Sequence, residues 1–297
     1  MNTWSAHWRG LISPGPARVQ TPMPSQAADL NFERSGQGEP IVLIHGIGAE
    51  LCVWEPVIGA LAERLDVIAV DLPGFGHSPP LPDGVTPTPE ALADAIARLM
   101  DELGIASAHL AGNSLGGWVA LELGKTERAR SITALCPAGL WGAPLDPEGA
   151  PARGGAQRAA RAARPLLPLL MASRRLRRLA LAHVVADPDR VPRAAATRMV
   201  SSYARATAYE ATNVAMRQGH FTGATRIKVP LTVAFGEHDR LIRPVRLRVP
   251  GARTLVLPGC GHIPMWDRPE LVSDLLLETA APKALATPSR LPGASQE

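Results

Sequence analysis

The chain has 297 residues, 46% of them hydrophobic, and a net charge of +4, so it is long enough for one large α/β domain or two small ones. Cys52, Cys136 and Cys260 have neither zinc-site nor disulfide-framework spacing, which disfavours a metal site and a disulfide-stapled secreted domain and indicates a reducing, cytoplasmic compartment. The longest uncharged stretch, residues 103–121, is interrupted by glycines and polar residues, so we expect no membrane span.

Both ends of the sequence have compositions typical of an unfolded chain. Residues 1–28 are rich in Pro, Gly and Ser and lack the apolar core of a secretory signal. We therefore expect a disordered N-terminal segment, in which Met23 is a candidate for the true start. Residues 281–297 are expected to form a disordered tail.

Apolar runs alternate with helical patterns along most of the chain. In chain order we predict an edge strand at 30–34, a strand at 41–44, a helix at 54–64, a strand at 67–70, a helix at 89–103, a strand at 107–111, a helix from Leu115, a strand at 132–136, strands at 231–235 and 254–257, and a helix at 269–279. Continuous apolar runs are typical of strands buried on both faces. The alternation predicts an α/β fold with a mostly parallel central sheet flanked by helices, and ligands bound at the carboxyl ends of the strands.

Residues 139–225 break this rhythm. The segment is rich in Ala and Arg, has helical periodicity and contains no buried-strand pattern, so we predict an all-helical cap inserted after the strand at 132–136, with the core formed by 29–138 and 226–280. It contains thirteen arginines and no lysine against five acidic residues. Such charge is compatible with nucleic acid or an anionic substrate. With few aromatic side chains for base stacking, a solvated helical face is the preferred interpretation, and we expect no nucleic-acid partner.

The sequence Gly112-Asn113-Ser114-Leu115-Gly116 stands between the strand at 107–111 and the helix that follows. Strand, sharp turn and helix are the context of a nucleophile elbow, in which the turn lifts a serine hydroxyl above the sheet edge. Ser114 is therefore the predicted nucleophile. The backbone N–H of Leu115, at the helix N-terminus, is a predicted donor to an oxyanion.

A serine hydroxyl needs a general base and a group that orients the base. In this arrangement an acid and then a histidine follow the serine. Asp239 comes after the strand at 231–235 and His262 after the strand at 254–257, so we predict that His262 is the base and Asp239 its partner. Glu237 remains an alternative acid, and His77 and His238 are alternative histidines near strand ends.

His45-Gly46 follows the strand at 41–44. This loop is predicted to present the N–H of Ile47 as the second oxyanion donor, opposite Leu115. The alternative is that His45-Gly46 forms only a turn.

These motifs together resemble the α/β-hydrolase superfamily over residues 30–280, and the loop Asp71-Leu72-Pro73-Gly74-Phe75-Gly76-His77-Ser78 adds to the likeness. The resemblance implies a capped hydrolase that needs no cofactor. Serine at the elbow argues against the haloalkane dehalogenase and epoxide hydrolase branches, which use aspartate there. The chain is partly similar to the carbon–carbon bond hydrolases of aromatic meta-cleavage pathways: Asn113 suits them, whereas the glycine-rich stretch after Gly46 is absent and Ile263 stands where tryptophan is frequent. Cofactor-free haloperoxidase-like esterases are also similar.

The predicted substrate pocket is mainly apolar; it comprises His45, Gly46, Phe75, Asn113, Trp141, Met265 and Trp266. Ordinary core packing is the alternative for Met265 and Trp266 and the preferred interpretation for Trp118; Cys260 is interpreted as a small buried hydrophobe. The sequence thus predicts a serine hydrolase that forms an acyl-enzyme with a small or medium apolar ester. Alternatives are a carbon–carbon hydrolase of a vinylogous diketone acid, with Arg190 a candidate to bind the carboxylate, an acyltransferase, and a receptor without turnover.

Overall fold

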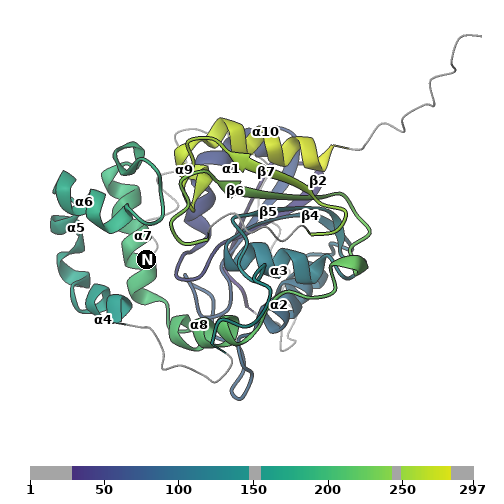
Figure 1. The fold of residues 1–297 in the computed structure, drawn as a ribbon, viewed down its shortest axis with the longest axis horizontal. Coiled ribbons are helices and arrows are strands. Elements are labelled where there is room, and N and C mark those ends of the chain that lie inside the picture. The colour runs from purple at the N-terminus through teal and green to yellow at the C-terminus, as the bar shows by residue number, and fades with distance from the viewer. Residues whose placement is uncertain (1–28, 147–154, 243–248, 282–297) are drawn as a thin grey trace, which may run out of the picture.

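The structure is a computed structural model that describes residues 29–146, 155–242 and 249–281. Its seven strands form one sheet in the order β1-β3-β2-β4-β5-β6-β7 (Figure 1). The strands are β1 (Phe32–Ser35), β2 (Glu39–Ile44), β3 (Leu65–Val70), β4 (Ala108–Asn113), β5 (Ala129–Leu135), β6 (Leu231–Gly236) and β7 (Arg253–Leu257). Only the edge strand β1 pairs antiparallel with its neighbour, and the others pair in parallel. The predicted mostly parallel sheet is confirmed.

Helices cover both faces of this sheet. α1 (Glu55–Ala62) and α10 (Pro269–Ala280) pack on one face, and α2 (Pro89–Glu102) and α3 (Leu115–Leu123) on the other (Figure 1). Strands β3, β4 and β6 are buried at every position, because alternate residues enter the two opposite cores. In β2, for example, Val42 joins the core under α2 and α3, whereas Leu43 joins the core under α1 and α10.

Most predicted strands and helices differ from the observed ones by one to three residues at their ends, and two elements differ more. The helix predicted at 54–64 is a 3-10 turn, η3 (Leu51–Trp54), followed by α1. Pro56 lies in the first turn of α1 and has no N–H to donate, a position that a helix tolerates only near its start. A four-residue helix, α9 (Pro264–Asp267), is not predicted from the sequence. Of the predicted disordered ends, 1–28 and 281–297, residues 1–28 with Met23 and residues 282–297 lie outside the described residues.

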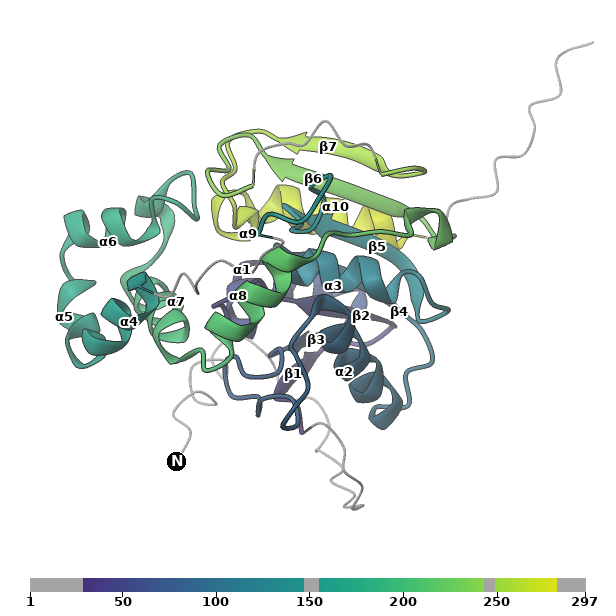
Figure 2. The ribbon, with the colours of Figure 1, turned by 60° about the horizontal axis from the view of Figure 1, so that its bottom comes forward.

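Among the residues that the structure describes, every regular element between β5 and β6 is helical. The helices are α4 (Gly155–Ala162), α5 (Leu167–Leu170), α6 (Arg174–Leu181), α7 (Arg193–Arg205) and α8 (Tyr209–Gln218), with short 3-10 turns η4 (Arg164–Leu166), η5 (Pro188–Arg190) and η6 (Ala224–Arg226). We call residues 155–226 the helical insert. Helices α4 to α7 form a lobe beside the core, in which α7 packs against α4, α5 and α6 (Figure 2). Within the described ranges, no helix has the length and apolar character needed to cross a bilayer.

Candidate active site

Ser114 occupies a strained turn between β4 and α3. Its backbone has φ 57° and ψ −118°, a conformation that non-glycine residues rarely adopt and that is typical of functional turns. The flanking glycines are required sterically: a Cβ at Gly112 would lie 2.0 Å from the carbonyl oxygen of Gly116, and one at Gly116 would lie 2.1 Å from that of Ile44. The turn therefore has the geometry expected of a nucleophile elbow.

The residue before the serine connects this turn to the loop of His262. Asn113 Nδ2 donates to the carbonyl oxygen of Leu135 at 3.2 Å and to that of His262 at 2.8 Å. Ser114 N–H donates to the same Leu135 oxygen at 2.9 Å. Because both Asn113 bonds come from the side-chain Nδ2 group, Asn113 holds the histidine loop beside the end of β4.

Asp239 and His262 form a buried pair. His262 Nδ1 lies 2.8 Å from Asp239 Oδ2, and Asp239 Oδ1 accepts the N–H groups of Leu241 at 2.8 Å and Ile242 at 2.9 Å. Burial alone would raise the pKa of Asp239, but the hydrogen bond from His262 and those two N–H groups outweigh it and hold the pKa below its usual value. An ionised Asp239 keeps the proton of His262 on Nδ1, which leaves Nε2 to act as a base.

The alternative acid and histidines have different surroundings. Glu237 and His238 are exposed, with Glu237 Oε2 3.6 Å from His238 Nε2, and the Glu237 carboxylate accepts the N–H of Gly259. His77 is also exposed, and its N–H donates to Asp71. The surroundings therefore favour the buried Asp239–His262 pair, while the catalytic assignment itself stays a prediction.

The two predicted oxyanion donors lie on backbone that flanks Ser114. Leu115 is the first residue of α3, where a backbone N–H has no acceptor within the helix. The loop that carries Ile47 runs close to the serine, since a Cβ at Gly46 would lie 2.9 Å from Ser114 Cβ. The arrangement is compatible with two N–H groups converging on a reacting carbonyl oxygen.

His45 braces this loop from inside the protein. Its side chain is fully enclosed, with Nδ1 2.8 Å from the carbonyl oxygen of Gly46 and Nε2 accepting the N–H of Leu72 at 2.9 Å. Burial lowers the pKa of His45, against the opposing effect of the Asp71 carboxylate, so the imidazole is neutral with its proton on Nδ1. Both ring nitrogens form hydrogen bonds with backbone groups, so His45 has no polar atom left to contact a substrate.

The other predicted pocket residues divide into enclosed and partly exposed side chains. Phe75 and Met265 are almost completely buried, and Phe75 packs edge-on against the His45 ring. Trp141 and Trp266 retain exposed surface. Trp141 packs edge-on against Trp118, whose own indole is core and donates to Glu122, as the preferred interpretation of Trp118 expects. Whether these side chains line a substrate pocket stays a prediction.

A cysteine lies next to the candidate acid and base. The donor atoms of Cys136, Asp239 and His262 all lie within 4.8 Å of one another. Burial raises the pKa of the Cys136 thiol well above its usual range, and burial raises that of Cys260 to about 12. Both groups therefore stay protonated at neutral pH, and a protonated thiol is a poor nucleophile.

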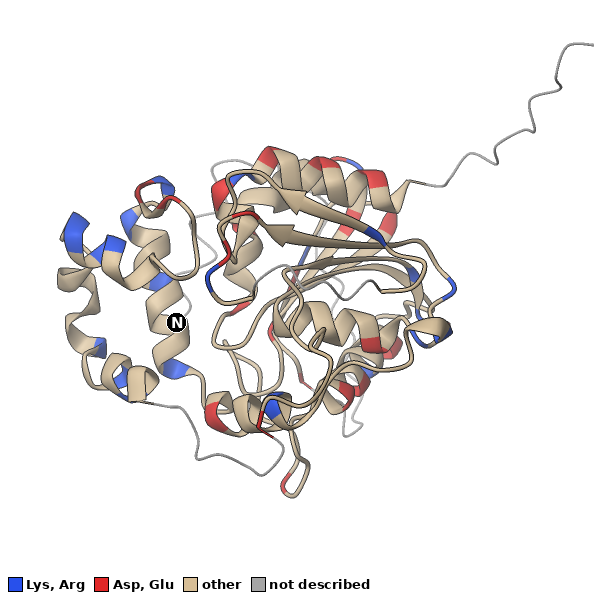
Figure 3. Ribbon diagram, viewed as in Figure 1, with Lys and Arg blue, Asp and Glu red and all other residues tan. Residues whose placement is uncertain are grey.

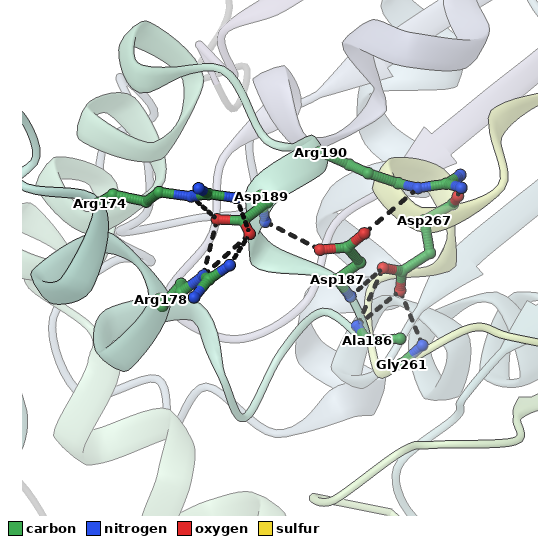
Figure 4. A network of polar contacts seen from close by, with 8 residues as sticks. All are labelled: Arg174, Arg178, Ala186, Asp187, Asp189, Arg190, Gly261 and Asp267. Carbon is green, nitrogen blue, oxygen red and sulfur yellow. Dashed lines mark hydrogen bonds and ion pairs between the residues drawn. The ribbon is translucent and has the colours of Figure 1, made fainter.

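Sequence reasoning missed Asp267, a buried carboxylate that joins the helical insert to the histidine loop (Figure 4). It accepts the N–H of Gly261 at 2.7 Å, that of Ala186 at 2.9 and 3.1 Å, and that of Asp187 at 3.1 Å. A Cβ at Gly261 would lie 2.7 Å from the Ala186 nitrogen, so the two segments are in direct contact. An acid directly after the apolar stretch 263–266 was the available sequence signal.

Arg190 does not provide the inward-facing cation that a carboxylate-bearing substrate would need. Its side chain is 59% exposed, and its guanidinium donates to the Asp267 carbonyl oxygen at 3.0 Å and lies 3.6 Å from Asp187 (Figure 4). Nearby, hydrogen bonds from Arg178 and Arg174 hold the pKa of Asp189 well below its usual range. These arginines are thus engaged at the surface of the insert.

The helical insert also contacts loops at the carboxyl edge of the sheet. Arg198 and Arg205 on α7 form ion pairs with Glu55 and Glu50, which flank η3. A Cβ at Gly48 would lie 2.7 Å from the Tyr203 ring. Together with the Asp267 contacts, these place parts of the insert against both the Ile47 loop and the His262 loop.

Replacement of Asp267 by asparagine tests the link between the insert and the histidine loop. At least one of the backbone N–H groups that donate to the Asp267 carboxylate would then face the Nδ2 group of asparagine and lose its acceptor. We therefore expect the free energy of unfolding to fall by about 1–3 kcal/mol. Because Gly261 precedes His262, kcat for an ester substrate is expected to fall by about 10- to 100-fold with little change in KM. Urea denaturation and steady-state kinetics measure both. Asp274→Asn, at an exposed position of α10, is the matched control, and equal kinetics for both variants would contradict the expectation.

Comparison with known proteins gives the site a context. A model of the alpha/beta hydrolase family matches residues 41–275. The chain is 34% identical over 200 residues to an epoxide hydrolase (EphH) of Mycobacterium tuberculosis, covering 62% of this chain and 91% of that protein. It is 44% identical over 105 residues to a pimeloyl-[acyl-carrier protein] methyl ester esterase of Aeromonas hydrophila subsp. hydrophila, covering 35% and 39%. Among solved structures, the 2-hydroxy-6-oxo-6-phenylhexa-2,4-dienoate hydrolase of Rhodococcus sp. strain RHA1 has a TM-score of 0.64 and 25% identity, covering 84% and 98%.

Proposed function

The chain belongs to the alpha/beta hydrolase family, and from that premise we propose that it is a serine hydrolase that forms an acyl-enzyme on Ser114. One observation carries the proposal: Asn113, the residue next to Ser114, donates to the carbonyl oxygen of His262 and so ties the Asp239–His262 pair to the elbow. A hydroxyl in a strained elbow, a base with a fixed tautomer and a buried acid are the parts that acyl transfer to serine requires.

In the proposed mechanism, Ser114 Oγ attacks the acyl carbon while its proton moves to His262 Nε2. The N–H groups of Leu115 and Ile47 stabilise the oxyanion, and Asp239 stabilises the imidazolium. The C–O bond then breaks, and the leaving alcohol takes the proton from His262. Water, deprotonated by His262, attacks the acyl-serine, and return of the proton to Ser114 Oγ releases the acid.

We propose a small or medium apolar carboxylic ester as the substrate, with the helical insert acting as the cap over the site. The contacts of the insert with the Ile47 and His262 loops support this placement. A relative named as a methyl ester esterase supports ester chemistry. Another relative is named as an epoxide hydrolase, but the branch of the family that opens epoxides uses an aspartate where this chain has Ser114.

Carbon–carbon bond hydrolysis is the second candidate, because the Rhodococcus hydrolase shares the fold at 25% identity and Asn113 suits that branch. The candidate is weakened by Arg190, whose guanidinium contacts Asp267 at the surface. Acyl transfer would follow the same route, with an alcohol or thiol in place of water when the acyl-serine is attacked.

A covalent trap tests the proposal. A fluorophosphonate reacts with a serine that is activated by a base, and we expect mass spectrometry of the digested protein to locate the adduct on the peptide containing Ser114. Parallel assays with p-nitrophenyl esters of increasing chain length, a vinylogous diketone acid and an epoxide, each with and without added alcohol, separate the reaction classes. An unlabelled Ser114, or turnover of the epoxide alone, would overturn the proposal.

A further inference from the structure

The outer helices of the insert are built from an unusual stretch of sequence. Residues 155–186 contain seven arginines but no acidic and no aromatic residue. These residues form α4, α5 and α6, and Figure 3 shows basic positions on α4 and α6 with acidic ones only in the neighbouring turn η5. The charged residues of this stretch are therefore all basic, although Arg174 and Arg178 pair with Asp189 and Arg158 pairs with Glu210.

Leucines of η4, α5 and α6 include both buried and exposed side chains. On the inner side, Leu167 and Leu181 are only 3% and 2% exposed, and Leu181 joins the core that includes α7 residues. On the outer side four further leucines are exposed, namely Leu166 at 56%, Leu169 at 71%, Leu176 at 40% and Leu179 at 72%. Each outer pair has a spacing of three residues, which places its members side by side on a helical turn. Packing within the insert does not explain these four side chains.

Two cations accompany the outer leucines. Arg164 and Arg175 are exposed and form no ion pair with any residue that the structure describes. We call the six residues Arg164, Leu166, Leu169, Arg175, Leu176 and Leu179 the outer cap face. Both ribbon views place α5 and α6 at the outer edge of the lobe, on the side of α7 away from the sheet (Figures 1 and 2). Neither the core nor the candidate active site covers this face.

We propose that the outer cap face binds the surface of an anionic lipid bilayer. Exposed leucines between cationic side chains are the composition of helices that lie in the headgroup region, where apolar side chains enter the acyl boundary and cations contact lipid phosphates. Guanidinium groups suit phosphate oxygens because their planar donors bind two oxygens at once. Attachment at this face holds the helical insert against the membrane while the sheet stays in water.

Two other occupants fit the face less well. Phosphates of a nucleic acid would pair with the arginines, but the leucines would stay exposed to water. No Phe, Tyr or Trp in 155–186 offers base stacking. A second copy of the chain would cover the leucines, but a two-fold interface would bring equal positive charges together. An anionic bilayer satisfies both the charge and the apolar surface.

Vesicle sedimentation tests the proposal with the full chain. We expect wild type to sediment with vesicles of phosphatidylcholine containing about one third phosphatidylglycerol, to bind pure phosphatidylcholine much more weakly, and to dissociate at high salt. Leu169→Asp/Leu179→Asp and Arg164→Glu/Arg175→Glu are each expected to reduce the partition coefficient by at least about tenfold. All four positions are exposed, so thermal stability and hydrolysis of a water-soluble ester should match wild type.

Matched controls use exposed residues elsewhere on the protein. Leu145→Asp/Leu241→Asp and Arg64→Glu/Arg98→Glu change the same side chains outside the outer cap face and should bind vesicles as wild type does. Failure of wild type to bind the anionic vesicles, or equal binding by the face and control variants, would overturn the proposal. The proposal would also be overturned if light scattering shows a wild-type dimer that Leu169→Asp/Leu179→Asp loses, while wild type binds no vesicles. A third contrary result would be that wild type binds duplex DNA and that the leucine variants bind it equally well.

Discussion

Replacement of Ser114 by alanine is expected to lower kcat for p-nitrophenyl esters by about 10⁴- to 10⁶-fold and to remove fluorophosphonate labelling. Without the hydroxyl no acyl-enzyme forms, and only the oxyanion donors and substrate binding remain to accelerate attack by water. Alanine keeps the Cβ atom, so the strain at φ 57° and the packing of the elbow are unchanged. We therefore expect a folded protein with the melting temperature of wild type.

The control for this experiment is a serine that the site does not use. Ser273 is buried in α10, where its hydroxyl donates to the Pro269 carbonyl oxygen, so Ser273→Ala should keep both turnover and labelling. Labelling that persists in Ser114→Ala would assign the nucleophile to another residue. A wild-type protein that binds an ester without turnover or labelling would instead favour a receptor, and Ser114→Ala would then keep full biological output.

Strands and the elbow could be predicted because their signals are local. A strand buried on both faces must be apolar at successive positions, as in residues 67–70, and the sheet built from such runs is confirmed. The elbow motif is also short, and Gly112 is imposed by the carbonyl group of Gly116 four positions on, although Gly116 is imposed by Ile44 on the neighbouring strand β2. Sequence order then placed Asp239 and His262 at the ends of neighbouring strands, where the structure has them hydrogen-bonded.

Features that depend on distant partners could not be predicted in the same way. Asp267 binds the N–H of Ala186, 81 positions earlier in the chain, and no pattern around either residue specifies that contact. The enclosure of His45 depends on Leu72 from the next loop, and the exposure of Arg190 depends on how η5 lies against α9. In the insert, periodicity predicts helices but not which leucines face α7, because α5 and α6 carry both buried and exposed leucines.

Replacement of Asp239 by asparagine is expected to lower kcat by about 10⁴-fold, and the reason lies in the hydrogen bonds of this carboxylate. Oδ1 accepts the N–H groups of Leu241 and Ile242, so an asparagine would place its carbonyl oxygen there and direct its NH₂ group at His262 Nδ1. Because this NH₂ group can only donate, Nδ1 must accept, and the imidazole proton then lies on Nε2. In that tautomer His262 cannot accept the proton of Ser114, and rate–pH profiles with p-nitrophenyl esters should show the loss at neutral pH.

His262→Ala alone is expected to lower kcat by about 10⁶-fold, and adding Asp239→Asn to it should cost no further rate, because Asp239 acts only through the imidazole. Additive losses would mean that Asp239 contacts the reacting atoms directly. Glu237→Gln is the matched control at the exposed neighbouring acid and should change kcat by less than about twofold. If Glu237→Gln instead loses activity as Asp239→Asn is expected to, the acid would be Glu237, and the buried Asp239 carboxylate would serve to hold the backbone of Leu241 and Ile242.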